Sequence, residues 1–383
     1  MKKPLHVGVL VDASRAYGRG LCRGIANYAD TRDDWIILAH ERPEVEEFPA
    51  WLKKQRLDGL IAYIPNQTLY RRIAALGIPV VDVHGRCRSP QMPVIESDDA
   101  AIVRRAFDFF RQAGFHHLAY CGYPSVFFSD QRQEAARLEG GENRVHLYAP
   151  SRATRAGQDL YKFEKSGAEA GLAAWLRSLP KPVAILACND IRGQQVINAC
   201  RETGIRIPED VAVLGVDNDE IICRLCRPTL SSVEPDGERI GYAAGETIAR
   251  LLAGKPTEMR LKVPPRGIVE RSSTDTVAAG DPTVIRAARL IRAEAGTAAT
   301  VGQICEAVGV SRSTLDQLFR LHLGRSVAGE ISRIRLQRSQ NMVRYSDLAL
   351  GEIAKSCGFS SATYFGRFFK RETGMTPAAF RRG

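Results

Sequence analysis

Short apolar runs rich in β-branched residues recur along the first 270 or so positions of the chain. Amphipathic segments such as 20–29 and 102–112 separate these runs and predict helices. Buried strands that alternate with helices are typical of a parallel sheet covered on both faces. The pattern therefore predicts an α/β unit with strands at Val7–Val11, Leu57–Ile64, Val80–Val83, Leu118–Cys121, Val183–Cys188 and Val211–Val216.

Beyond Thr274 the strand pattern stops and the apolar spacing becomes helical. Ile285, Ala288 and Ile291 mark one helix, and the segment 331–343 marks a longer one. The intervening residues 275–282 are small and polar and end in Asp-Pro, a composition that favours a linker. We expect an α/β domain at 1–274, a linker at 275–282 and an all-α domain at 283–383.

The all-α region carries the same short pattern twice. In the first copy, an apolar-faced segment from Ile304 ends at Gly309, and Ser311 begins the next helix. In the second copy, the segment from Ile353 ends at Gly358, and a serine-rich turn follows. A glycine that accepts positive φ and a serine cap are the features of a helix-turn-helix motif. Two ordinary helical hairpins are the alternative interpretation.

The distribution of charge favours the helix-turn-helix interpretation. Residues 283–383 contain 16 Lys and Arg against 7 Asp and Glu, a net charge of +9, so the first 282 residues hold only +2 of the total +11. A basic excess confined to the segment with the two motifs is typical of a domain that binds a polyanion. We therefore expect double-stranded DNA as a partner.

The overall composition narrows the class of protein. A length of 383 residues suggests two or three domains, and the 25% charged and 44% hydrophobic content is that of a globular protein. There is no apolar run of membrane-spanning length and no signal-peptide core, so a cytoplasmic location without a membrane partner is expected. The nine cysteines have no framework spacing. Cys223 and Cys226 lack a second ligand pair, and neither a metal nor a cofactor is expected.

The two motifs and the closing sequence Phe368-Phe369-Lys370-Arg371-Glu372-Thr373-Gly374-Met375-Thr376-Pro377-Ala378-Ala379-Phe380-Arg381 resemble the AraC/XylS family of transcription regulators. In that family both recognition helices enter successive major grooves of the operator. The resemblance implies base reading by Arg312, Ser313, Asp316 and Gln317 in the first helix and by Ala362, Thr363, Gly366 and Arg367 in the second.

Side-chain chemistry supports part of that set. Arg can bond guanine and Gln adenine through two hydrogen bonds, worth about 1–3 kcal/mol of discrimination each, which favours Arg367 and Gln317. Asp316 would repel phosphate, so it should face a cytosine amino group or solvent. The phosphate contacts are expected from Arg320, Lys370 and Arg371.

Polar residues follow several of the predicted strands. Open parallel sheets bind ligands beyond the carboxyl ends of their strands, and carboxylates, amides and an Arg beside aromatic rings suit a sugar. The candidates from the residues themselves are Ser14, Tyr17, Arg19, Asn66, Asp98, Phe127, Asn189, Asp190 and Asp217. Alternatively, about half of the Asp and Asn residues are helix caps and turn formers.

Four phrases resemble the LacI/GalR sensor, a two-lobed domain of the type I periplasmic-binding-protein fold. They begin at Asp58-Gly59, Ala119-Tyr120, Ala184-Ile185 and Val213-Leu214. In that family the residues that match Arg132 and Asp217 bind sugar hydroxyls from one lobe, with Asn189 and Asp190 nearby.

A LacI-like sensor ahead of an AraC-type tail resembles the XylR-like family of xylose-operon regulators. Local phrases at Ala16-Tyr17, Leu230–Val233 and Val263–Asp275 extend the resemblance over nearly the whole chain. It implies an activator of carbohydrate-use genes that responds to a monosaccharide such as xylose, acts as a homodimer and contacts RNA polymerase.

The sequence lacks the motifs of other classes of protein that share an α/β fold. No G-x-S-x-G motif occurs, and Gly18-x-Gly20 lacks the third glycine of a dinucleotide-binding turn, so an enzyme is not expected. A regulator whose sensor binds a nucleoside, or no small molecule, stays open.

Overall fold

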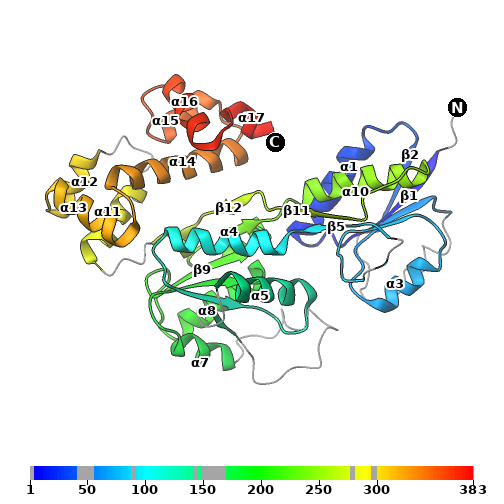
Figure 1. Cartoon of the computed structure of the whole chain (residues 1–383), viewed down its shortest axis with the longest axis horizontal. Helices are drawn as coiled ribbons and strands as arrows, with labels where there is room; N and C mark the ends of the chain where they lie inside the picture. Colours follow the sequence, from blue (N-terminus) through cyan, green and yellow to red (C-terminus); the bar gives the residue numbers. More distant parts are fainter. Residues whose placement is uncertain are drawn as a thin grey trace.

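The computed structural model describes residues 4–40, 56–87, 89, 92–140, 145–148, 170–276, 281–294 and 300–382. Within them the chain forms two α/β lobes followed by a helical domain (Figure 1). The helical domain lies beside the second lobe, at the end of the molecule away from the N-terminal strand.

The first lobe is built on a parallel sheet with the order β11-β5-β4-β3-β1-β2. Two of its helices, α1 and α10, pack closely where Gly24 faces Glu238. A Cβ at Gly24 would lie 1.9 Å from the Glu238 carbonyl oxygen, so this approach requires a glycine. The elements of this lobe are β1 (Leu5–Leu10), α1 (Ala16–Ala29), β2 (Trp35–His40), β3 (Gly59–Ala62), α3 (Gln67–Ala74), β4 (Val80–Asp82), β5 (Val94–Ser97), α10 (Gly237–Leu252) and β11 (Arg260–Val263).

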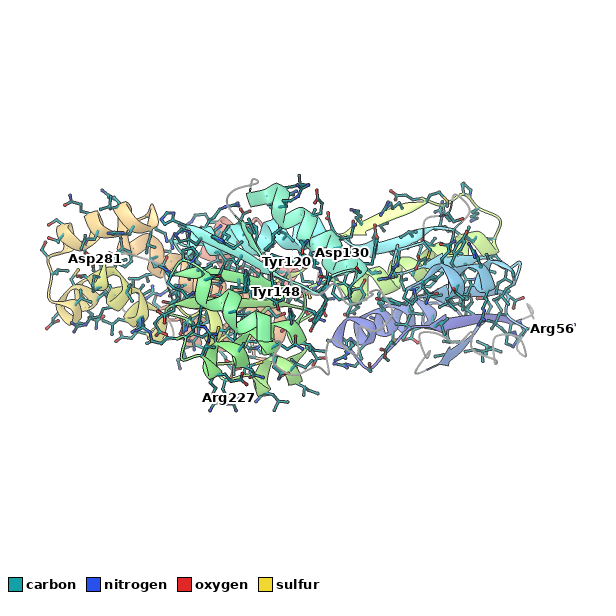
Figure 2. All side chains as sticks on the ribbon, turned by 90° about the horizontal axis from the view of Figure 1, so that it is seen from below. Arg56, Tyr120, Asp130, Tyr148, Arg227 and Asp281 are labelled. Atoms are coloured by element: carbon teal, nitrogen blue, oxygen red, sulfur yellow. The ribbon has the colours of Figure 1, made fainter. Side chains whose placement is uncertain are left out.

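The second lobe has the sheet order β12-β10-β9-β8-β6-β7, in which β12 alone runs antiparallel to its neighbour among the described strands. Its interior holds Arg192, whose guanidinium lies 4.8 Å from the Tyr123 ring and 5.0 Å from the Tyr148 ring. Tyr148 and Tyr120 both lie in this lobe (Figure 2). The elements are α4 (Asp99–Gln112), β6 (His117–Cys121), α5 (Phe127–Gly140), β7 (Val145–Leu147), α7 (Ala170–Ser178), β8 (Val183–Ala187), α8 (Asp190–Glu202), β9 (Val211–Val216), α9 (Glu220–Leu225), β10 (Ser231–Glu234), β12 (Gly267–Val269) and the 3₁₀ turn η1 (Ser272–Thr274).

In the described part of the chain, three segments pass between the lobes: β5 to α4, β10 to α10, and β11 to β12. The carboxyl ends of β1, β3 and β4 in one lobe and of β6, β8 and β9 in the other therefore lie on either side of these connections. This is where an open parallel sheet binds its ligands.

The six strands predicted from the sequence all form, with bounds shifted by up to two residues. Six further strands were not predicted, and four of them, β2, β7, β11 and β12, are the edges of the two sheets. Edge strands are only half covered, so they need no continuous apolar run, as Arg260-Leu261-Lys262-Val263 in β11 illustrates.

The helical domain consists of α11 (Pro282–Ala293), α12 (Val301–Val308), α13 (Arg312–Leu323), α14 (Val327–Tyr345), α15 (Leu350–Ser356), α16 (Ala362–Thr373) and α17 (Pro377–Arg382). The helix predicted at 331–343 is α14, which starts four residues earlier because Ser326 accepts a hydrogen bond from Gly329 N at 3.1 Å. Its 19 residues span about 28 Å at 1.5 Å each. Residues 277–280 of the expected linker lie outside the described residues, whereas Asp281 caps α11.

Each helix-turn-helix motif has its own core. Phe319 is central to the first core, which also takes residues from α11, α12 and α14. Phe359, Phe365, Phe368 and Phe369 dominate the second. No helix among the described residues is long and apolar enough to cross a membrane.

Candidate ligand site and nucleic-acid interface

Arg132 on α5 is the central residue between the lobes. Its side chain is 6% exposed, and its Nε donates to Asp99 Oδ1 at 2.7 Å. Its Nη1 donates to the backbone oxygen of Cys188, and the guanidinium lies 5.2 Å from the ring of Phe128. The side chain is therefore held from three sides, with its position fixed at the lobe junction.

Two carboxylates and two tyrosines surround Arg132. Burial opposes the guanidinium charge, but Asp99 and Asp217 outweigh burial and raise the pKa of Arg132. Burial raises the pKa of Tyr17 and Tyr63, and the carboxylate of Asp217 adds to both shifts. These five residues, Tyr17, Tyr63, Asp99, Arg132 and Asp217, are called the interlobe site below.

Aromatic rings from both lobes meet beside the interlobe site. The ring of His84, after β4, stacks on Tyr63 with centroids 4.1 Å apart, and its other neighbour is Phe127 of the second lobe at 5.3 Å. Burial lowers the pKa of His84 to about 3, so the imidazole is neutral at physiological pH. The rings offer apolar faces, and the tyrosine hydroxyls offer polar ones.

Sequence reasoning missed Tyr63, His84 and Asp99. Each follows a strand by one or two residues, which is the available signal. Asn66 and Asp98 are the predicted residues in the turns that hold Tyr63 and Asp99, and no residue was predicted after β4.

Several of the predicted ligand residues serve as helix caps. Asn66 accepts a hydrogen bond from Leu69 N, Asp98 from Ala101 N and Asn189 from Arg192 N, at 2.8 to 3.0 Å. Each is the N-cap of the helix that follows its strand. Their side-chain oxygens thus have a structural role, as the alternative interpretation expected.

Asp190 and Arg19 also have partners in the protein. Asp190 is buried, and it accepts from Asp219 N and from Ser232 Oγ, both at 2.6 Å. Arg19 of the first lobe forms an ion pair with Asp219 of the second, with Nη2 and Oδ2 3.0 Å apart. Arg19 thereby links the two lobes, while Ser14 in the preceding turn is exposed.

The cysteines provide no metal site in the described structure. Cys223 and Cys226 are both buried with free thiols, and no group of three His, Cys, Asp or Glu side chains among the described residues could hold a metal ion.

The two helix-turn-helix motifs have the predicted turns. Gly309 and Gly358 adopt φ of +78° and +73°, and Ser311 and Ser361 cap the recognition helices α13 and α16. Most of the predicted DNA-binding side chains are exposed on these helices: Arg312, Ser313, Gln317, Arg320, Ala362, Thr363, Arg367, Lys370 and Arg371. Gly366 is half-buried.

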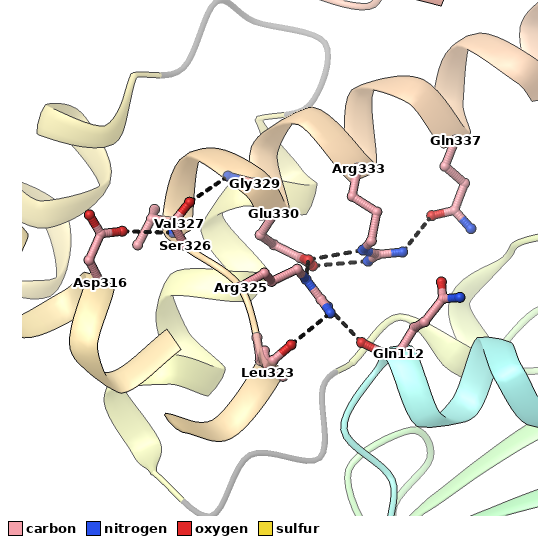
Figure 3. A network of polar contacts seen from close by, with 10 residues as sticks. All are labelled: Gln112, Asp316, Leu323, Arg325, Ser326, Val327, Gly329, Glu330, Arg333 and Gln337. Atoms are coloured by element: carbon pink, nitrogen blue, oxygen red, sulfur yellow. Dashed lines mark hydrogen bonds and ion pairs between the residues drawn. The ribbon is translucent and has the colours of Figure 1, made fainter. Parts of the chain in front are cut away.

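Asp316 has a structural partner that sequence reasoning did not foresee. Its Oδ1 accepts a hydrogen bond from Val327 N at 2.9 Å, at the first turn of α14 (Figure 3). The expectation was a cytosine amino group or solvent. A carboxylate near a helix N-terminus is stabilised by the free N–H groups there, so α14 positions Asp316 through the backbone.

A groove of about 500 Å³ lies between the two motifs. Its lining includes the cationic Arg335 and Lys355 together with Tyr364, which is 52% exposed on α16. Sequence reasoning missed Tyr364 because its neighbours Thr363 and Phe365 already fitted the motif. The groove gives the surface between the recognition helices a positive lining.

The helical domain is also tied to the sensor by charged residues. Glu330 is fully buried on α14, and its carboxylate is paired with Arg325 and Arg333 (Figure 3). Arg325 Nη2 donates to the backbone oxygen of Gln112, at the end of α4 in the second lobe, at 2.6 Å. Burial alone would raise the pKa of Glu330, but Arg333 and Arg325 outweigh it and lower that pKa to about 2.

Comparison with known proteins covers both parts of the chain. Residues 107–274 match the model of the periplasmic binding protein-like domain, and residues 304–383 match that of a helix-turn-helix domain. The xylose operon regulatory protein of Escherichia coli K12 is 29% identical over 98% of this chain and 96% of its own length. The transcriptional repressor PurR of Aliivibrio salmonicida is 31% identical over 67% of this chain and 77% of its own length.

The solved structure of the xylose-binding transcription activator XylR matches the whole arrangement. It superimposes with a TM-score of 0.61 at 29% identity and covers 100% of this chain and 98% of its own. The two-lobed sensor and the paired helix-turn-helix motifs thus align together, in this order, with nearly the full length of that protein. The chain belongs to the XylR-like family of transcription regulators, in which a periplasmic-binding-protein-like sensor precedes an AraC-type DNA-binding domain.

Proposed function

We propose that this regulator binds a monosaccharide, such as xylose, at the interlobe site and controls carbohydrate-use genes as an activator. The observation that carries this proposal is the buried Arg132, which sits between the carboxylates of Asp99 and Asp217 where the lobes meet. Two relatives that match nearly the whole chain, the xylose operon regulatory protein and the xylose-binding activator XylR, support a sugar as the class of ligand.

The chemistry of the interlobe site suits a sugar. Each hydroxyl of a sugar both donates and accepts, so it needs carboxylate acceptors and guanidinium donors within one small volume. Asp217 and Arg132 supply these from the second lobe, and Tyr17 supplies a hydroxyl from the first. The ring faces of Tyr63 and Phe127 can pack on sugar C–H groups. A ligand held by both lobes would favour the arrangement in which they are close together.

Isothermal titration of the full chain with a panel of pentoses, hexoses and nucleosides tests the ligand. We expect a pentose to bind, and Arg132→Ala and Asp217→Ala each to weaken binding at least about tenfold, because a hydroxyl left unpaired costs about 1–3 kcal/mol. Arg137→Ala is the matched control, since Arg137 lies exposed on the same helix and pairs with Glu134 of that helix. Wild-type affinity in both site variants would remove the assignment, and nucleoside binding would replace the sugar.

For the DNA, we propose that α13 and α16 enter neighbouring major grooves of an operator. The connecting helix α14 spans about 28 Å, comparable to one DNA turn of about 34 Å. Arg312, Ser313, Gln317, Ala362, Thr363, Gly366 and Arg367 are proposed to face the bases, and Arg320, Lys370 and Arg371 the phosphates. The groove with Arg335 and Lys355 lies where the backbone between the two grooves would pass.

We further propose a homodimer that binds two half-sites and contacts RNA polymerase, with sensor 1–274, linker 275–282 and DNA-binding domain 283–383. One basic domain makes few phosphate contacts, and specificity over a genome usually needs a second copy. A footprint that covers a single pair of major grooves at high protein concentration would contradict the dimer.

A further inference from the structure

The last turn of α14 touches the sensor at one of its interlobe connections. Arg344 Nη1 donates to the backbone oxygen of Arg266 at 2.7 Å. Arg266 lies between β11, which belongs to the first lobe, and β12, which belongs to the second. The C-terminal end of α14 therefore contacts a segment whose position depends on both lobes.

Arg266 also holds a second interlobe connection. Its Nε lies 3.0 Å from Asp236 Oδ1, and its Nη2 lies 3.0 Å from Glu238 Oε2, at the passage from β10 to α10. Its backbone N donates to the oxygen of Glu234 at 2.8 Å. Two of the three connections between the lobes are thus bound to each other at the point that Arg344 contacts.

On the side of the DNA-binding domain, Arg344 is fixed to the second motif. Its guanidinium lies 4.5 Å from the Phe380 ring, and Phe380 packs edge-on against Phe369 of α16 at 5.2 Å. Arg381 Nε donates to the backbone oxygen of Val343 at 3.0 Å, which joins α17 to the end of α14. A displacement of Arg344 would therefore displace the core that carries the second recognition helix.

The first motif, in contrast, is attached to the second lobe. Arg325 reaches the end of α4 at Gln112, as Figure 3 shows, and Arg289 Nη2 lies 2.7 Å from Glu209 Oε1. Gln112 and Glu209 both belong to the second lobe. Consequently α14 has its first end fixed to one lobe and its last turn fixed to the connection between the lobes.

We propose that Arg344 is the positioning residue that transmits movement of the lobes to the second recognition helix. A rotation of the lobes shifts the connection at Arg266 relative to the second lobe, so the two ends of α14 receive different displacements. The angle of α16 to α13, and hence the spacing of the two reading surfaces, changes with it. This inference rests on the proposed function insofar as the sugar is the agent that rotates the lobes.

The first test measures operator affinity of the full chain by fluorescence anisotropy, with and without xylose. Allosteric coupling is typically about 5- to 150-fold. The coupling factor is the ratio of operator affinities with and without xylose. We expect Arg344→Ala to reduce this factor to about twofold or less and to leave the affinity for xylose unchanged within about twofold. Arg338→Ala on the exposed face of α14 is the matched control for loss of one charge and should retain wild-type coupling. Wild-type coupling in Arg344→Ala would overturn the proposal.

The second test needs no sugar and separates this inference from the identity of the ligand. Asp219→Ala removes the ion pair with Arg19 that links the lobes, so it should alter their angle in the free protein. We expect it to change operator affinity by about threefold or more when Arg344 is present and much less in the Arg344→Ala background. Equal effects in the two backgrounds, including no effect in either, would overturn the role of Arg344. If the effect of Asp219→Ala differs clearly between the two backgrounds but xylose does not change operator affinity, the proposed ligand is wrong and the proposed role of Arg344 stands.

Discussion

The two helix-turn-helix motifs follow the same local pattern but differ in what holds them. The first has a core with a single phenylalanine, Phe319, and is bordered by the buried Glu330 with its two arginines. The second has a core of several aromatic rings packed at a tilt, with the ring centroid of Phe359 5.2 Å from that of Phe365 and 5.1 Å from that of Phe368. The first motif is attached to one lobe of the sensor and the second to the connection between the lobes.

The comparison shows that one sequence pattern can serve two mechanical roles. The turn glycine, the serine cap and the apolar spacing specify how two helices meet, and these are alike in both motifs. Residues outside the pattern decide whether the motif is anchored by buried charges or moves with a neighbouring element. Predictions that separate the two motifs test this view.

The largest expected effect is on the buried carboxylate of the first motif. Glu330→Gln removes the charge that compensates Arg325 and Arg333, and breaking a buried pair typically costs about 3–5 kcal/mol. Hydrogen exchange of the full chain should show faster opening of α12 and α13 than of α15 and α16. Glu306→Gln, on the exposed side of α12, is the control and should change little. Uniform opening of both motifs would mean that they are not separately held.

Lowering the pH should destabilise the first helix-turn-helix motif more than the second. The pKa of Glu330 is lowered from the ordinary 4.5 to about 2 in the folded protein, so its contribution to stability is complete above pH 4.5 and is lost as the pH falls toward 2. The size of this contribution is about 3 kcal/mol at 1.36 kcal/mol per pH unit. Among the described residues, the second core contains no buried carboxylate. Hydrogen exchange followed from pH 6 to pH 3 should therefore show the first motif opening before the second, and the reverse order would contradict the assignment.

A smaller effect distinguishes base reading from phosphate contact within the second motif. Arg367→Ala should cost about 1–3 kcal/mol of operator binding and relax preference at one base pair, because a fork of two donors to guanine is lost. Lys370→Ala should weaken binding to all DNA sequences alike. It should also reduce the slope of log affinity against log salt concentration by about one. Binding titrations against single-base operator variants at several salt concentrations measure both. An unchanged base preference in Arg367→Ala would mean that another residue of α16 reads the sequence.

The smallest expected effect separates two neighbours in the first recognition helix. Asp316→Ala should lower stability by about 1 kcal/mol, the usual worth of a capping carboxylate, and leave base preference intact, since Asp316 accepts from Val327 N. Gln317→Ala should leave stability intact and change the preference at one base pair. Thermal unfolding of both variants measures their stability, and titrations with single-base operator variants measure their base preference. A changed base preference in Asp316→Ala together with an unchanged one in Gln317→Ala would show that Asp316 rather than Gln317 reads a base.

Residues near strand ends show why a ligand site is harder to predict from the sequence than a helix. Asn66, Asp98 and Asn189 were expected to bind ligand, and the structure shows that they cap helices, because a cap and a ligand contact favour the same residue types at the same place. Tyr17, Arg132 and Asp217 were expected as well, and the structure brings them together with Asp99 and Tyr63. Their role in binding stays a prediction.

The sequence by itself determined the local elements: buried strands from apolar runs, recognition helices from glycine and serine turns, and a basic DNA-binding region from its charge. These depend on residues near one another in the chain, where backbone geometry and hydrophobic spacing dominate. Only the tertiary structure decided that Arg19 pairs with Asp219, 200 residues away, and that Arg344 reaches Arg266, 78 residues away. Ion pairs and backbone contacts between distant segments leave no periodic trace in the sequence, because the packing of whole lobes, not the spacing of residues, brings the atoms within reach.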